Sequence, residues 1–296
     1  MGWFANRKVN KILELRARQG MTEQAAEDAL RAIGEEAVEP LVVGLGHSSR
    51  DVKMTAIKVL GQLKARPAVE PLLQALADPD DALVDAAALA LGAIQDGKAA
   101  APLVAVILAR EEPLKAQAAG ALEALGGPAV QPILDALAKD DAPGRQHLIA
   151  TLGKLGDRQA IPALVRRLWD KHKDVRAAAT VALRQLGWTA AKPEEQAWWD
   201  MATGNWYHCI SLGAAALAPL CQAIEDDDYH VRVAVLVALK DKGLQGDRAT
   251  VSRFASTLQR ALREEGTRSA QYAASMGENA VRNHMRAVLD KLGAAK

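Results

Sequence analysis

The chain has 296 residues, of which 50% are hydrophobic but only 4% aromatic, and its formal net charge is +1. This near-neutral balance argues against a chain organised as a whole around nucleic acid, which requires a strongly basic face, so we expect no nucleic-acid partner. Its two cysteines are too few for a disulfide framework in a chain of this length.

The first 36 residues predict N-terminal capping helices. Residues 1–20 hold no apolar segment of the signal-peptide type, and we expect a cytoplasmic protein. Two interpretations of residues 3–19 remain open, namely a cap that places its apolar side on the following helices and a helix that lies on a membrane surface. The bases are Arg7, Lys8, Lys11, Arg16 and Arg18, and the apolar side is Trp3, Phe4, Val9, Ile12 and Leu13.

Residues 37–187 contain a unit that recurs every 30 or 31 residues. Self-similarity at such a fixed period is typical of solenoids of stacked supersecondary units. We therefore predict an all-α, right-handed α-solenoid of antiparallel helix pairs, five in residues 37–187 and a sixth in residues 214–243. The marker prolines are Pro40, Pro71, Pro102, Pro132, Pro162 and Pro219, and the marker leucines are Leu60, Leu91, Leu122, Leu152, Leu183 and Leu239.

Each unit consists of two apolar-periodic segments separated by a polar turn. In the fifth unit, Val175, Ala179 and Leu183 have the spacing of a buried helix stripe. The recurrent proline falls in the first turn of the first helix, where no intrahelical hydrogen bond is lost. The apolar run 82–94 is too short to span a bilayer, and it contains Asp85. The predicted pairs are 37–46 and 50–63, 68–77 and 81–94, 100–109 and 112–125, 129–138 and 143–155, 160–169 and 173–186, and 214–225 and 228–242.

The period fails between residues 188 and 213, and again after residue 243. The first interruption holds four of the six tryptophans, and we predict a degenerate helical pair there. Either the rings fill the space lost by shortening a repeat, or they form an exposed binding spot, because tryptophan is enriched in interface anchors. The four are Trp188, Trp198, Trp199 and Trp206. Residues 244–296 are predicted to be C-terminal capping helices.

The segments AVEPLVVGL, AVEPLLQAL, AVQPILDAL and AIPALVRRL are each followed by a DVR-like start and an AL-x-x-LG end. They resemble bacterial HEAT-like repeats of the phycobiliprotein-lyase type over about residues 37–243. The resemblance implies a HEAT-like solenoid and, by family alone, a phycobilin lyase-like subunit or a HEAT-like DNA glycosylase as alternatives to a scaffold. The chain lacks the His-Glu motifs of the HEAT-repeat deoxyhypusine hydroxylases, because none of its histidines is followed directly by a glutamate.

Two surface columns appear when the second helices are aligned on the leucine row. Seven residues before each leucine stand Lys53, Val84, Lys115, Arg145, Arg176 and Arg232, and two residues before it stand Lys58, Leu89, Gly120, Ala150, Val181 and Val237. In the family that the chain resembles, the second column faces the concave side. We predict a groove with a mildly hydrophobic floor and a basic ridge, suited to a protein segment with apolar anchors and acidic flanks.

The partner-binding residues predicted from these columns are Lys53, Lys115, Arg145, Arg176, Arg232, Leu89, Val181 and Val237. Two alternatives remain open. The bases can instead pair with acids in neighbouring turns, such as Asp174 or Asp228, and adjacent helices can cover the apolar column.

No motif indicates catalysis or a cofactor. There is no glycine-rich phosphate loop, G-x-S-x-G elbow or HExxH sequence. His208, Cys209 and Cys221 offer three zinc-binding side chains, but their spacing matches no usual zinc pattern, and we expect both cysteines to be small core residues. The sequence therefore predicts a non-catalytic protein-binding scaffold without catalytic, cofactor or metal sites.

Overall fold

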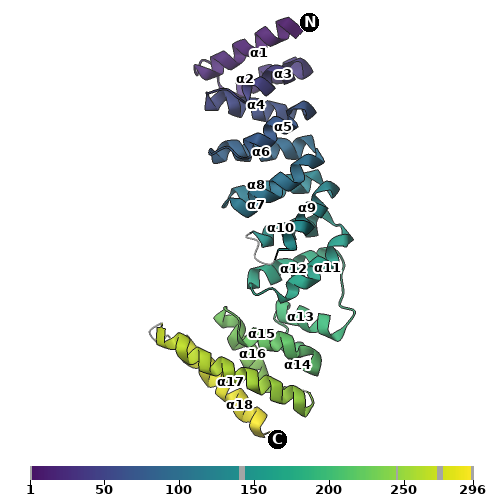
Figure 1. The fold of residues 1–296 in the computed structure, drawn as a ribbon, viewed down its shortest axis with the longest axis vertical. Helices are drawn as coiled ribbons and strands as arrows, with labels where there is room; N and C mark the ends of the chain where they lie inside the picture. Colours follow the sequence, from purple (N-terminus) through teal and green to yellow (C-terminus); the bar gives the residue numbers. More distant parts are fainter. Residues whose placement is uncertain (1, 140–143, 245, 272–275, 295–296) are drawn as a thin grey trace. The chain divides into compact units, whose positions relative to one another are not determined.

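The computed structural model describes residues 2–139, 144–244, 246–271 and 276–294, and these form helices without any strand. The chain divides into two compact units, Met1–Ala160 and Ile161–Lys296. In each unit, antiparallel helix pairs stack on one another (Figure 1). The predicted all-α solenoid of stacked helix pairs is confirmed.

The first unit contains the N-terminal helices and four helix pairs, each close to the bounds that the repeat predicts. A short 3-10 turn precedes each first helix, and the marker proline is the third residue of that helix in every pair. The helices are α1 (Gly2–Ala17), α2 (Glu23–Ile33), α3 (Val38–Gly44), α4 (Arg50–Gln62), α5 (Val69–Ala75), α6 (Asp81–Ile94), α7 (Ala100–Ala109), α8 (Leu114–Leu125), α9 (Val130–Leu137) and α10 (Arg145–Leu155).

The second helices of the first unit pack closely because small residues meet between them. A Cβ atom on Gly61 of α4 would lie 2.8 Å from the Cα of Ala90 on α6, and one on Gly92 would lie 3.0 Å from the Cα of Ala121 on α8. The marker leucines beside these contacts are fully buried. Close approach without voids is what gives dispersion forces their full effect in a core, so α4, α6 and α8 form a continuous row.

Helix α1 covers the start of this row. Val9, Ile12 and Leu13 are buried, while Phe4 is 75% exposed, and α1 contacts α2, α3 and α4. Because the apolar stripe is used for packing, the structure favours the capping interpretation over insertion of that stripe into a membrane surface. Among the described residues, no helix combines the length and apolarity needed to cross a bilayer.

The second unit begins with the fifth pair and contains the tryptophan-rich segment as a short helical pair. The helices α17 and α18 pack on α15 and α16. The helices are α11 (Ile161–Arg166), α12 (Lys173–Gln185), α13 (Pro193–Thr203), α14 (Trp206–Ser211), α15 (Leu217–Ile224), α16 (Tyr229–Lys242), α17 (Arg248–Gln271) and α18 (Met276–Ala294).

Candidate functional site

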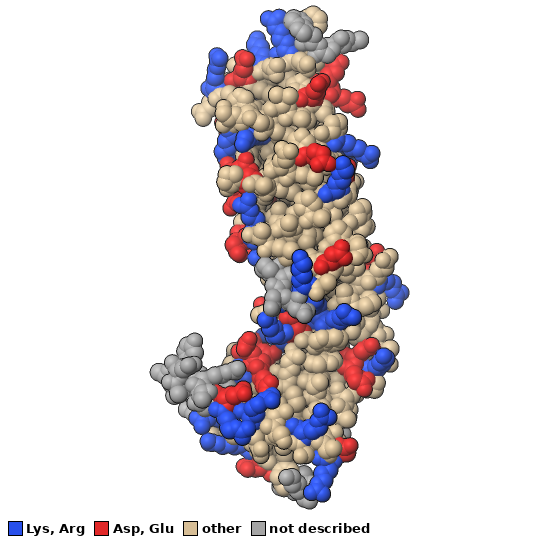
Figure 2. Space-filling model, in the orientation of Figure 1, with Lys and Arg blue, Asp and Glu red and all other residues tan. Residues whose placement is uncertain are grey.

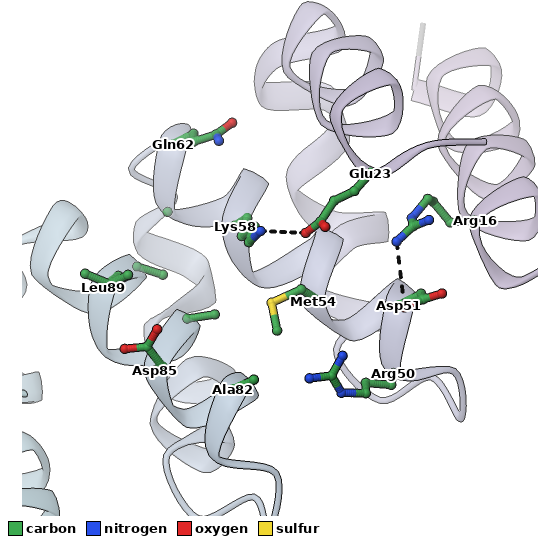
Figure 3. Close-up of a pocket in the computed structure, with 13 residues that line it drawn as sticks. Arg16, Glu23, Arg50, Asp51, Met54, Lys58, Gln62, Ala82, Asp85 and Leu89 are labelled. Atoms are coloured by element: carbon green, nitrogen blue, oxygen red, sulfur yellow. Dashed lines mark hydrogen bonds and ion pairs between the residues drawn. The ribbon is translucent and has the colours of Figure 1, made fainter. Parts of the chain in front are cut away.

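A pocket lies between α4 and α6 in the first unit, bordered by α1 and α2 (Figure 3). Its cavity volume of about 410 Å³ falls within the roughly 300–1,000 Å³ typical of ligand sites. One wall is apolar and consists of Met54 on α4 with Ala82, Ala86, Leu89 and Ala90 on α6. We call this cavity the α4–α6 pocket.

Three cations line the α4–α6 pocket, and each has an acidic partner. The hydrogen bond that Lys58 Nζ donates to the Glu23 carboxylate raises the pKa of Lys58. All three cations are therefore already paired within the chain. The pairs are Lys58 Nζ with Glu23 Oε1 at 2.5 Å, Arg16 Nη2 with Asp51 Oδ1 at 3.7 Å, and Arg50 with Asp80 (the first two are dashed in Figure 3).

Asp85 differs from the other charged groups of the pocket. Its Oδ1 atom is buried and has no hydrogen-bond partner among the described residues, and no ion pair within the described part of the chain involves its carboxylate. Burial raises the pKa of Asp85, because water solvates the charged form poorly there. The carboxylate lies on the same side of α6 as Leu89 (Figure 3), so an acid without a partner adjoins an exposed apolar side chain.

The apolar column of the sequence analysis is open to solvent at four of its six members, namely Leu89, Gly120, Ala150 and Val181. Leu89 is 53% and Val181 52% exposed, whereas Val237 is half-buried. Neighbouring helices therefore do not cover this column at Leu89 and Val181. We call the surface that carries these positions on each unit, taken by itself, the second-helix face of that unit. It consists of Lys58, Leu89, Gly120 and Ala150 in the first unit and of Val181 and Val237 in the second unit.

The basic column does not form the expected ridge. Arg145, Arg176 and Arg232 are only 5%, 3% and 7% exposed. Arg176 Nη1 donates to the carbonyl oxygens of Asp170 at 2.9 Å and Lys171 at 3.0 Å. Arg232 Nη1 makes the same two bonds to the carbonyls six and five residues before it. Both arginines thus close the turn that ends the preceding helix, and they are not free for a partner.

The two lysines of this column are also paired. Lys53 Nζ lies 3.2 Å from Asp78 Oδ2, and Lys115 Nζ lies 3.4 Å from Glu111 Oε2. The Lys53–Asp78 pair joins neighbouring turns, as expected if the bases of this column pair with acids within the chain. On the face drawn in Figure 2, Lys and Arg side chains of the first unit alternate with Asp and Glu. A basic ridge is therefore no longer part of the candidate site.

The repeats themselves decide the family. A family model for HEAT repeats matches residues 12–91, 38–123, 69–147 and 130–195, which together span more than half of the chain. The chain belongs to the HEAT-repeat family. None of the curated protein sequences compared with it matches significantly.

Several solved structures are similar to the chain at low identity. The chain is similar to the complex of CpcE and CpcF of phycocyanin lyase from Nostoc sp. (21% identity, 86% of this chain and 94% of that chain, TM-score 0.38). It is also similar to human deoxyhypusine hydroxylase in complex with glycerol (19%, 99% and 98%, TM-score 0.33). Importin beta matches with 11% identity over 96% of this chain and 47% of that chain, at a TM-score of 0.50. These likenesses concern the fold alone.

Three of the four tryptophans that interrupt the HEAT periodicity lie in ring pairs. Trp206 is 9% exposed and lies in the core, and Trp188, Trp198 and Trp199 are half-buried. Ring centroids are 5.4 Å apart for Trp188 with Trp199 and 5.8 Å for Trp198 with Trp169. The rings fill the space beside the short pair α13–α14, as the first interpretation expects. Trp198 also lines a cavity of about 520 Å³.

Near this segment, His208 and Asp200 form a pair with Nδ1 and Oδ2 2.6 Å apart. A histidine held by a buried carboxylate suggests a catalytic dyad. The neighbouring thiol does not fit that role, because burial, together with the charge of Asp200, raises the pKa of Cys209 to about 12. Cys209 Sγ instead donates to the carbonyl oxygen of Ala197, which is the core role predicted for it. No cluster of metal-binding side chains occurs among the described residues.

Proposed function

We propose that this HEAT-repeat chain is a non-catalytic scaffold that binds a protein segment along its second-helix face. The observation that carries the proposal is the exposure of Leu89 at the wall of the α4–α6 pocket. An exposed leucine beside a cavity offers an apolar anchor point, and repeat proteins present extended surfaces of this kind. In the second unit, the exposure of Val181 supports a second contact of the same type.

The chemistry expected of the bound segment differs from the sequence-based prediction. Acidic flanks were inferred from a basic ridge, and that basis is lost because Arg145, Arg176 and Arg232 are buried. The apolar anchors keep their support from Leu89 and Val181. A segment with branched or aromatic side chains, laid across the second helices, therefore fits the surface best.

Peptide selection tests the proposal. A library of short random peptides is selected on the immobilised full chain, and enriched peptides are measured by fluorescence polarisation against wild type and Leu89→Glu. We expect at least about a tenfold loss of affinity for Leu89→Glu, since loss of an apolar anchor and introduction of a desolvated charge each cost binding free energy.

Val43→Glu is the matched control, because Val43 is 76% exposed but lies on a first helix. The control should leave peptide affinity unchanged. Failure to enrich any peptide, or equal losses in both variants, refutes the second-helix face as the binding surface.

A further inference from the structure

The ion pairs around the α4–α6 pocket leave one carboxylate, that of Asp85, without a cation. Every cation lining it is matched by a carboxylate, so the six paired side chains leave no net charge. Asp85 is the charged residue of the pocket that belongs to none of these pairs. No nitrogen of a described Lys, Arg or His residue lies at ion-pair distance from its carboxylate. A buried acceptor without a donor is rare in native structures and calls for an explanation.

We propose, building on the proposed function, that the α4–α6 pocket recognises a lysine or arginine side chain of the bound segment, with Asp85 as its counterion. The segment's next apolar side chain then rests on Leu89. The bound segment is then expected to carry a basic side chain, whereas the sequence alone suggests a segment with acidic flanks.

The shape and chemistry of the pocket match this kind of side chain. Lysine and arginine carry a long apolar stem below a charged head. Met54, Ala82 and Ala86 line the pocket together with Asp85, so they can contact the stem while the carboxylate meets the head. A charge-assisted hydrogen bond of this kind is about twice as strong as a neutral one, and the partial burial of Asp85 limits competition from water.

Other cations fit less well. A divalent metal such as calcium takes about six to eight oxygen ligands, whereas Asp85 is the single unpaired carboxylate of the pocket and Arg50 and Lys58 line the same cavity. A singly charged head on a flexible stem can approach Asp85 from the apolar side, away from the paired cations.

The selected peptides provide the test. Selection is repeated in parallel on wild type and on Asp85→Asn, and the most enriched wild-type peptide is resynthesised with its basic residue replaced by norleucine. We expect wild type to enrich peptides with Lys or Arg beside a large apolar residue. Either change, Asp85→Asn or norleucine, should weaken binding by about tenfold or more.

A charge swap separates direct contact from an indirect effect. Asp85→Lys should restore binding to a peptide whose basic residue is replaced by glutamate, which a structural role for Asp85 does not explain. Asp81→Asn is the matched control, since Asp81 is on the same helix and 71% exposed, with Arg110 as its partner. It should bind like wild type, and circular dichroism should show that every variant is folded.

The outcomes separate this inference from the function on which it rests. Peptides that bind without a basic residue, or equally well to Asp85→Asn, refute the basic anchor and leave the second-helix face as a binding surface. Absence of any enriched peptide refutes both. Binding of free n-butylammonium to wild type as tightly as the peptide would assign the site to a small amine instead of a protein segment, and so would overturn the inference.

Discussion

Arg176 and Asp226 form a buried ion pair between two turns of the second unit. Arg176 Nη2 lies 2.5 Å from Asp226 Oδ2, and the two side chains are 3% and 2% exposed. In the first unit, Lys53 and Asp78 hold the equivalent positions in the repeat and pair at 3.2 Å. At these two positions, the basic residues of the column therefore link one inter-helix turn to another through ion pairs.

Arg176→Gln should lower the free energy of unfolding by about 3–5 kcal/mol, because Asp226 would then be a buried charge without its partner. Chemical denaturation monitored by circular dichroism measures the change. Lys173→Gln removes a neighbouring pair, whose Nζ lies 2.7 Å from Asp228 but whose lysine side chain is 55% exposed. This control should hardly change the unfolding midpoint; equal effects of the two variants would contradict the structural role of the buried pair.

Gly61→Ala should destabilise the first unit by about 1–3 kcal/mol, because the new methyl group would lie 2.8 Å from Ala90 and force α4 and α6 apart. Gly120→Ala is the matched control, since nothing lies within 4 Å of the position that its methyl group would take. It should stabilise α8 by up to about 1 kcal/mol through helix propensity alone. Thermal unfolding of both variants gives the comparison, and stabilisation by both would argue against close packing of the second helices.

Asp85→Asn should raise the free energy of unfolding at neutral pH by about 1 kcal/mol, because an uncharged amide costs less to bury than a carboxylate without a partner. Because burial raises the folded-state pKa of Asp85 above its ordinary value of 3.8, the carboxylate destabilises the fold above that folded-state pKa. Its penalty shrinks as the pH falls and is gone below 3.8.

The difference between wild type and Asp85→Asn should therefore narrow on acidification. Denaturation at several pH values measures it, and the other carboxylates cancel because both proteins share them. The neighbouring charges, Arg16, Glu23, Arg50, Asp51 and Lys58, are likewise common to both. A difference that grows as the pH falls would contradict the unpaired state of Asp85.

Cys209 should resist thiol reagents in the folded protein, because its pKa of about 12 leaves almost no thiolate near neutral pH. A Cys221→Ser variant isolates its reaction with Ellman's reagent. We expect labelling only after denaturant is added. Rapid labelling of the folded variant would reopen a catalytic role for Cys209 beside His208.

The helix pairs were predictable from the sequence because their signals are local. Pro132 and Leu152, for example, place α9 and α10 nearly where the structure has them, since a proline in the first turn and apolar spacings of three and four residues define a helix without reference to distant segments. The column that contains Leu89 and Val181 was also recognisable from the sequence, but the sequence left open whether adjacent helices cover it, and the structure shows both side chains exposed.

The α4–α6 pocket and the burial of the basic column could not be predicted in the same way. The partner of Arg176 is 50 residues away in the chain, and the walls of the pocket come from four helices. Asp85 did leave one signal, as an acid inside the apolar run 82–94. Its meaning depends on whether a base lies opposite it, which only the packing of α1, α2 and α4 decides.

Site-specific photo-crosslinking in the source cells tests the central claim most directly. A photoreactive phenylalanine analogue is placed at Leu89 or, as control, at Val43, and crosslinked peptides are sequenced by mass spectrometry. Adducts from position 89 that map to one recurrent segment of a partner protein, with few from position 43, are the predicted result. Adducts from position 43 alone, or none from position 89, would contradict binding at the second-helix face.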